Sequence, residues 1–223
     1  MSKAYKQYSV TINGITPLLL HKHNIKWDER VKVWTKDPAN KGISIPGDCR
    51  TPAWTWIGGC YFADDLLVIE SDNLMSMLRD AGKKCAASKG RGTLKAATQS
   101  GIIVDQIGWP IVSSKGTVSK KDIMSLKDET SFTDHEEIAA ELGFELFVKP
   151  AKIGTQKHIR VRPRFDKWSV AGSITVLDET LTKDVIATLF VQAGRFVGLC
   201  DWRPGSPTPG HFGMFESEIK EIK

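Results

Sequence analysis

The sequence lacks the cysteine spacing that would indicate a metal or redox centre. Its four cysteines, Cys49, Cys60, Cys85 and Cys200, are scattered, with no CxxC and no following pair of spaced histidines. Structural zinc sites take their ligands from such short motifs. We therefore expect no metal ion and no cofactor, and mostly buried, reduced thiols.

Long apolar runs are also missing. None of the runs in the sequence is long enough to cross a bilayer, and no charged-then-apolar leader opens the chain. Apolar residues make up 41% of the chain and charged residues 26%, as in ordinary globular proteins. The sequence thus predicts a cytoplasmic protein without a membrane partner, folded as one domain over residues 1–223.

No constellation of catalytic residues stands out. The acidic residues are dispersed, whereas metal-assisted hydrolysis needs clustered carboxylates. The best candidates for cutting RNA are His21, His23 and Asp28, which follow the first predicted strand. We expect a protein that is not an enzyme, and an endoribonuclease built on these three residues stays open as an alternative.

The motifs of duplex-reading proteins are absent as well. The sequence has no helix-turn-helix, basic zipper or zinc-finger spacing. Recognition of a single strand by a strand face and loops fits the sequence better.

The positive charge is concentrated in two segments. The net charge is only +5, but residues 83–95 carry five Lys or Arg and no acid, and residues 149–167 carry seven and one acid. The rest of the chain has 19 basic and 25 acidic residues. Two basic segments on an otherwise acidic protein favour a phosphate-bearing partner and salt-dependent binding.

The second basic segment contains a regular alternation. In KHIRVRPRFDKW (157–168), His158, Arg160, Arg162 and Arg164 occupy every second position, and apolar residues or proline fill the gaps. Residues two apart share a face of a β-strand. The pattern predicts a strand with one face toward a core and a cationic face toward a polyanion. Pro163 lacks an N–H, which predicts an edge strand or a hairpin arm.

The order of predicted elements favours an α+β fold with a ferredoxin-like core. Residues 24–47 lack a clear period and predict an irregular excursion, and residues 48–62 predict a helix. Residues 83–167 are expected to be largely insertion and hairpin elements that carry the basic charge. The expected core consists of strands near residues 8–13, 66–71, 101–112, 168–178 and the C-terminus, with helices over 71–82 and 182–193. Within the insertion, Thr133 and Glu136 have the spacing of a capping box and predict a short helix from Thr133.

Three short motifs occur in an order that resembles a known superfamily. They are ITPLLLH (15–21) after the first strand, ISIPGDCRTPAW (43–54), and the glycine-rich GRFVGLCDWRPGSPTPGHFGMFE (194–216) before the last strand. Together they are similar to the RAMP superfamily, whose members have RNA-recognition-like folds. The similarity is closest to the backbone subunits that coat guide RNA in CRISPR effector complexes, and extends to small phage and prophage proteins.

This resemblance implies a non-catalytic protein that binds single-stranded RNA, or DNA, and self-associates along the strand. Other CRISPR-type subunits are further implied partners, in antiviral defence. The glycine-rich loop is expected to let a ligand approach closely, and PGDCR (46–50) to offer N–H groups to phosphate at a helix start. The candidate nucleic-acid-binding residues are Arg50, Lys83, Lys84, Lys89, Arg91, Lys95, Lys157, His158, Arg160, Arg162, Arg164, Trp202 and Arg203.

Two further alternatives stay open beside the endoribonuclease. One is a phage single-stranded DNA-binding or annealing protein used in recombination. The other is a protein inhibitor that occupies a subunit slot in a host complex, which would bind little free nucleic acid.

Overall fold

The computed structural model describes residues 5–87, 90–126, 131–153 and 156–222 and has a mixed α/β fold with antiparallel sheets. Its α-helices are α1 (Ile25–Lys36), α2 (Ser71–Gly82), α3 (Lys95–Ser100), α4 (Lys120–Met124), α5 (Phe132–Glu141) and α6 (Lys183–Gln192). Two 3₁₀ helices, η1 (Pro38–Asn40) and η2 (Ala53–Gly59), and a π-helical turn, η3 (Ala193–Val197), complete the described helical elements.

The strands form one large sheet and two smaller ones. They are β1 (Lys6–Gly14), β2 (Leu18–Leu19), β3 (Phe62–Ala63), β4 (Leu66–Glu70), β5 (Ile102–Val104), β6 (Gly108–Pro110), β7 (Val112–Ser113), β8 (Gly116–Thr117), β9 (Glu145–Ile153), β10 (Gln156–Phe165), β11 (Trp168–Val176) and β12 (Phe215–Ile222). The sheets run β12-β1-β11-β7-β8 with β5 also on β11, β2-β10-β9, and β3-β4-β6.

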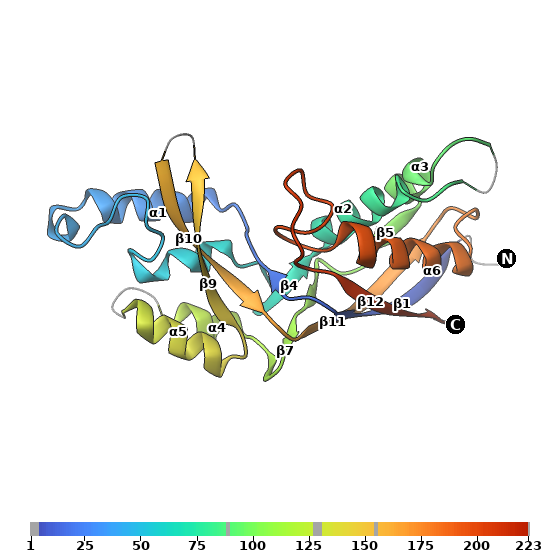
Figure 1. Cartoon of the computed structure of the whole chain (residues 1–223). Coiled ribbons are helices and arrows are strands. Elements are labelled where there is room, and N and C mark those ends of the chain that lie inside the picture. The colour runs from blue at the N-terminus through green and yellow to red at the C-terminus, as the bar shows by residue number, and fades with distance from the viewer. Residues whose placement is uncertain (1–4, 88–89, 127–130, 154–155, 223) are drawn as a thin grey trace.

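Figure 1 shows two lobes that meet near β2, β4 and β7. The sheet lobe holds β1, β5, β11 and β12 with α2, α3 and α6, and the hairpin lobe holds the β9–β10 hairpin with α1, α4 and α5. The loop of residues 198–213, red in Figure 1, leaves the sheet lobe and faces the hairpin.

The large sheet buries one face. Tyr8, Val10 and Ile12 alternate along β1 and are at most 1% exposed, as a strand with one covered face requires. On both flanks β1 pairs antiparallel, with β11 and with β12. Helices α2 and α6 pack against each other on the buried face. The strand expected at residues 8–13 and the helices expected over 71–82 and 182–193 are confirmed.

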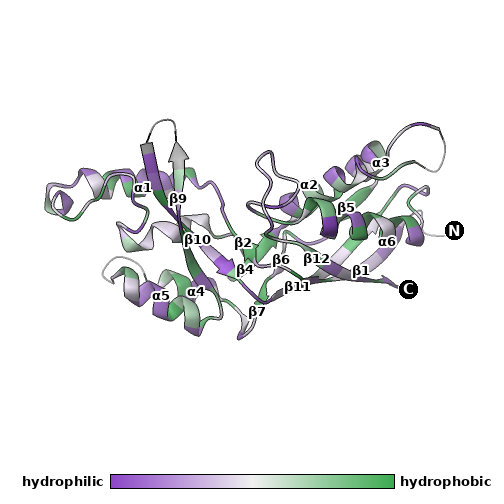
Figure 2. Ribbon diagram, viewed as in Figure 1, coloured by the Kyte–Doolittle hydropathy of each residue, from purple (hydrophilic) through white to green (hydrophobic). Residues whose placement is uncertain are grey.

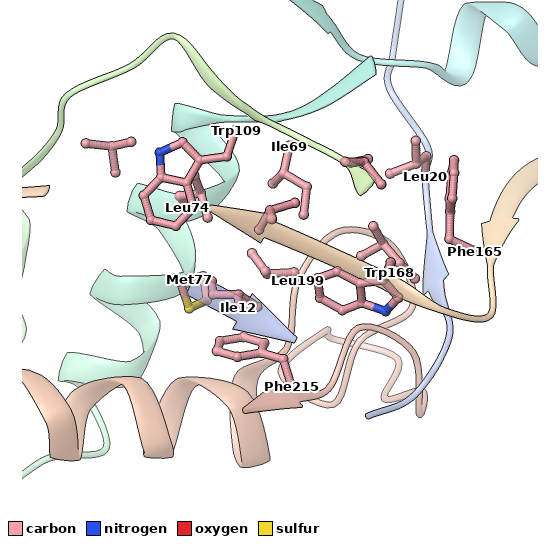
Figure 3. Packing of buried hydrophobic residues seen from close by; sticks show 14 of the residues in the cluster. Ile12, Leu20, Ile69, Leu74, Met77, Trp109, Phe165, Trp168, Leu199 and Phe215 are labelled. Carbon is pink, nitrogen blue, oxygen red and sulfur yellow. The ribbon is translucent and has the colours of Figure 1, made fainter. Parts of the chain in front are cut away.

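Two tryptophans fill the core along the buried face of β11, one at the start of the strand and one over Gly172, and Figure 3 shows both rings among the buried aliphatic side chains. Trp109 is 1% exposed and Trp168 is 5% exposed. Their indole N–H groups are satisfied: Trp109 donates to Gln106 Oε1 at 2.9 Å and Trp168 to the Thr16 carbonyl at 2.8 Å.

Three local expectations were wrong. The excursion before residue 47 contains a regular helix, α1, which the Asn24 side chain caps by accepting from the Trp27 N–H. The helix expected over 48–62 is the 3₁₀ helix η2. Helix α5 begins at Phe132, where Ser131 and Asp134 form the capping box instead of Thr133 and Glu136.

Aromatic side chains fill the hairpin lobe, and they belong to the same buried cluster as the core of the sheet lobe. Trp54 packs edge-on against Trp27 of α1, and Trp56 packs against Phe144 and His135. Both η2 tryptophans are therefore buried, at 3% and 1% exposure. They are buried because η2 lies between α1 on one side and α5 with Phe144 on the other.

The helices within the described ranges include none with both the length and the hydropathy that a bilayer crossing requires.

Candidate nucleic-acid interface

The alternation in residues 157–168 forms the strand that it predicts. Val161, Pro163 and Phe165 of β10 are buried, whereas Arg160, Arg162 and Arg164 are half-buried on the other face. Strand β10 is an arm of the β9–β10 hairpin but also the middle strand of its sheet, between β9 and β2. The edge-strand alternative for Pro163 was therefore wrong. Figure 2 shows hydrophilic residues on both arms of the hairpin.

The cationic face of β10 is partly neutralised by acids from other segments. Arg162 Nε lies 2.8 Å from Asp201 Oδ2 of the 198–213 loop. Arg164 pairs with Asp166 at 2.8 Å and lies 3.6 Å from Glu145 of β9. The Arg160 guanidinium donates to the Cys49 thiol at 3.3 Å. Sequence reasoning counted Asp166 but missed Glu145 and Asp201. Pairing of β9 with β10 places Glu145 beside Arg164, and folding of the 198–213 loop places Asp201 beside Arg162.

The loop of residues 198–213 is folded on its own chain. A Cβ added at Gly210 would lie 1.9 Å from the Trp202 carbonyl oxygen, and one at Gly213 would lie 2.1 Å from the Leu199 carbonyl oxygen. These two glycines are needed for close packing of the loop against itself. The expectation that they leave room for a ligand was wrong for these positions.

Trp202 of this loop is half-buried and joined to the hairpin. Its ring stacks with Phe212, with centroids 5.6 Å apart, and Lys149 Nζ of β9 lies 3.4 Å from the ring centroid. Phe147 of β9 also contacts Phe212, with centroids 5.7 Å apart. A base that stacks on the face of Trp202 under Lys149 would have to displace that ammonium group.

A cleft of about 750 Å³ lies between the hairpin and the loop. Its lining residues share a mixture of cationic, aromatic and small polar side chains, with one acid. They are Lys149, Pro150, Ala151, Arg162, Asp201, Trp202, Arg203, Ser206, Pro207 and Thr208. Three of the predicted binding residues, Arg162, Trp202 and Arg203, thus meet at one site, and Lys149 is the residue that prediction missed. Its signal was its place in the second basic segment.

Arg203 connects this cleft to the first basic segment through Asp80 of α2. Asp80 lies 3.3 Å from Arg203 and 2.7 Å from Lys83. Lys84, Arg91 and Lys95 are exposed around the end of α2 and the start of α3, which Figure 1 places away from the hairpin. Lys89 lies outside the described residues.

The segment PGDCR does not start a helix that faces a ligand. The Cys49 N–H donates to the Ile159 carbonyl at 2.9 Å, and the Ile159 N–H donates to the Gly47 carbonyl at 2.8 Å. The Arg50 N–H donates to Asp48 Oδ1, and the Arg50 guanidinium pairs with the same carboxylate at 2.6 Å. These N–H groups are used inside the protein, so the expectation that they bind phosphate was wrong.

This segment nevertheless brings Arg50 into the hairpin lobe with other predicted residues. Asp48 bridges to Ile159 of β10, which lies between His158 and Arg160. An added Cβ at Gly47 would lie 2.8 Å from His158 Nδ1. Lys157 is exposed near the start of β10.

The three candidates for nuclease chemistry separate in the structure. His23 Nδ1 lies 3.6 Å from Asp28 Oδ2 on an exposed surface. Desolvation, followed by the positive charge of Arg162, lowers the pKa of His21, and Asp201 opposes this shift. His21 is therefore near the cleft cations, whereas His23 and Asp28 pair with each other.

The open face of the large sheet offers no stacking surface. Register pairing places Gln7, Ser9, Thr11, Ser173 and Thr175 on that face, opposite Tyr8, Val10 and Ile12. The described part of β1, β11 and β12 carries no aromatic residue on it. RNA-recognition modules that bind on a sheet use aromatic residues there, so the hairpin cleft is the better candidate.

No group of three or more metal-ligating side chains occurs within residues 5–87, 90–126, 131–153 and 156–222. No protein-family model matches the chain, and no curated protein is significantly similar to it in sequence.

Proposed function

We propose that this protein binds single-stranded nucleic acid, preferably RNA, in the cleft between the β9–β10 hairpin and the 198–213 loop. The observation that carries this proposal is the convergence of Lys149, Arg162 and Arg203 on that cleft, beside Trp202. Lys and Arg side chains in a groove follow a phosphate backbone without reading sequence. Binding of this kind needs no catalytic group, and the protein acts without catalysis.

The strand order supports a ferredoxin-like core for the sheet lobe. The order β12-β1-β11-β5, with α2 between β1 and β5 and α6 between β11 and β12, agrees with a split β-α-β-β-α-β arrangement. Of the three motifs that resemble the RAMP superfamily, residues 194–216 include the loop that lines the cleft. Residues 15–21 contact this loop through the hydrogen bond from the Asp201 N–H to the Leu19 carbonyl, and residues 43–54 contact β10 through Ile159. In this proposal several copies coat one strand, as a CRISPR-type backbone subunit or a phage-encoded relative does.

Binding measurements with salt titration test the proposal. Purified, nuclease-treated protein is titrated into labelled single-stranded RNA and DNA of the same sequence, and fluorescence anisotropy is followed at several salt concentrations. We expect tight, length-dependent binding. The logarithm of the association constant should fall linearly as the logarithm of the salt concentration rises.

The variant Arg162→Ala tests whether nucleic acid binds in the cleft that Arg162 lines. It should weaken binding to all sequences alike and reduce the salt slope by about 1. Lys220→Ala is the control, because Lys220 is an exposed cation on β12 of the sheet lobe. Absence of binding to either nucleic acid would overturn the proposal, and co-purification of a protein partner would then favour the inhibitor alternative.

A further inference from the structure

Asp201 is the one acidic residue among the side chains that line the cleft. An ionised carboxylate accepts hydrogen bonds but donates none, and its negative charge repels phosphate. The backbone of DNA offers no hydrogen-bond donor, so it leaves the free acceptor positions of such a group without a partner. The position of Asp201 therefore favours a ligand that carries a hydrogen-bond donor next to a phosphate.

The backbone holds Asp201 in this position at a cost. The Asp201 N–H donates to the Leu19 carbonyl at 2.9 Å. The residues on both sides are in the left-handed region although neither is glycine: φ is 60° at Cys200 and 49° at Trp202. Each such residue costs on the order of 1 kcal/mol, and strain of this kind gathers at functional sites.

The side chain has acceptor capacity left. Asp201 Oδ2 lies 2.8 Å from Arg162 Nε, yet this N–H is not directed at an acceptor well enough to form a hydrogen bond. The Asp201 side chain retains 30% of its exposure. Arg162 and Asp201 thus present guanidinium donors and a carboxylate acceptor side by side in the cleft.

Resting on the proposed function, we infer that Asp201 reads the ribose 2′-hydroxyl and makes the cleft selective for RNA. The 2′-hydroxyl is a donor that DNA lacks, and it lies next to the 3′-phosphate of the same nucleotide. Arg162 binds that phosphate, and the adjacent carboxylate accepts the hydroxyl proton. Asp201 is a specificity-determining residue, whereas Lys149 and Arg203 bind the backbone of either nucleic acid.

Three oligonucleotides of one sequence test this inference: RNA, DNA and 2′-O-methyl RNA, which keeps the ribose but lacks the donor. The wild-type protein should bind RNA about 10-fold more tightly than either of the others, the effect of one hydrogen bond to a charged group. Asp201→Ala should bring the RNA-to-DNA affinity ratio close to 1. Asp201→Asn preserves the size of the side chain and replaces the alanine variant if that variant does not fold. It should also lower the RNA-to-DNA affinity ratio.

Asp64→Asn is the control for the loss of one negative charge. Asp64 is exposed in the turn between β3 and β4 at φ 46°, which asparagine tolerates. It should leave the RNA-to-DNA ratio unchanged. Equal binding of RNA and 2′-O-methyl RNA by the wild type would overturn the inference but not the proposed function. An equal gain for RNA and DNA in Asp201→Ala would overturn it too, because Asp201 would then only neutralise Arg162. Failure of every oligonucleotide to bind would contradict the proposed function itself.

Discussion

Lys149 Nζ lies 3.4 Å from the centroid of the Trp202 ring, and this contact joins the β9–β10 hairpin to the 198–213 loop. The two segments are more than 40 residues apart in sequence, and their contact closes one side of the cleft. A cation over an indole face at a partly exposed site contributes about 0.5–1 kcal/mol.

A double-mutant cycle measures this contact. Lys149→Met keeps the apolar stem and removes the charge, and Trp202→Leu removes the ring. We expect the two substitutions to be non-additive in the free energy of unfolding by about 0.5–1 kcal/mol. Lys220→Met paired with Trp202→Leu is the control and should be additive. Additive effects for the Lys149 pair would show that the hairpin and the loop are not coupled through this contact.

Asp80 links Arg203 of the cleft to the first basic segment through Lys83, and its substitution should lower stability in a pH-dependent way. Desolvation raises the pKa of its carboxyl group, but Lys83, Arg203 and Arg79 outweigh this and hold the pKa below its usual value. A depressed carboxyl pKa stabilises the folded state above the unfolded value of about 3.9, and this contribution is lost as the pH falls through the folded pKa.

We therefore expect Asp80→Asn to cost about 1–3 kcal/mol at neutral pH, because the amide oxygen still accepts but Lys83 and Arg203 lose the negative charge that they pair with. Urea unfolding at a series of pH values measures the difference from the wild type, which should shrink below about pH 4. Asp72→Asn, an exposed position in the first turn of the same helix, is the control and should change little. A cost for Asp80→Asn that is constant down to acidic pH would contradict this electrostatic account.

Local periodicity was enough to predict several elements but not how they meet. The strand near residues 8–13 and the helix over 182–193 were predictable, because the alternating burial along β1 and the cap of α6 at Thr182 depend on neighbours in sequence. The partners of Arg162 and Arg203 are Asp201 and Asp80, which come from another loop and another helix. The sequence showed a row of cations, and only the folded chain shows which of them are neutralised.

The wrong expectations share a physical cause. Gly210 and Gly213 suggested space for a ligand, but that space is filled by the carbonyl groups of Trp202 and Leu199. The backbone N–H groups near Cys49 suggested a phosphate site, but Ile159 of β10 uses one of them. Tertiary contacts decide both cases, and such contacts leave no mark in local sequence.

His135 should make stability fall as the pH drops below about 6.5. This histidine is fully buried, and its Nδ1 accepts a hydrogen bond from Trp56 Nε1 at 2.9 Å. Desolvation lowers its pKa, against smaller opposite effects of Asp134 and the Leu126 backbone. The unfolded chain then takes up the proton first, so stability is lost from about pH 6.5 down to the lower folded pKa, by at most about 1.4 kcal/mol per pH unit.

His135→Leu tests this assignment by thermal unfolding at several pH values. At pH 7 it should cost about 1–3 kcal/mol, because the Trp56 N–H loses its acceptor. The cost should become smaller between about pH 6.5 and 5. In this range the unfolded wild type binds a proton at His135 that the folded wild type does not, which lowers the stability of the wild type. His23→Gln replaces an exposed histidine and is the control for the substitution at pH 7, where its cost should stay within about 0.5 kcal/mol. An unchanged cost across this range would mean that His135 does not titrate there.

Gly172 of β11 should tolerate no side chain, because Trp109 occupies the space above it. An added Cβ would lie 2.0 Å from Trp109 Nε1, and the indole is 1% exposed and holds Gln106 by a hydrogen bond. Gly172→Ala must push this ring out of a close-packed core. We expect it to destabilise the protein by about 1–3 kcal/mol or more.

Gly92→Ala is the matched control for that substitution. Its added Cβ would meet nothing within 4 Å, so its effect on the free energy of unfolding should stay within about 0.5 kcal/mol. Urea unfolding of both variants measures the difference, and near-ultraviolet circular dichroism reports the displaced indole of Trp109. Equal stability of the two variants would contradict the packing of Trp109 against β11, and with it the position of β6 beside the large sheet.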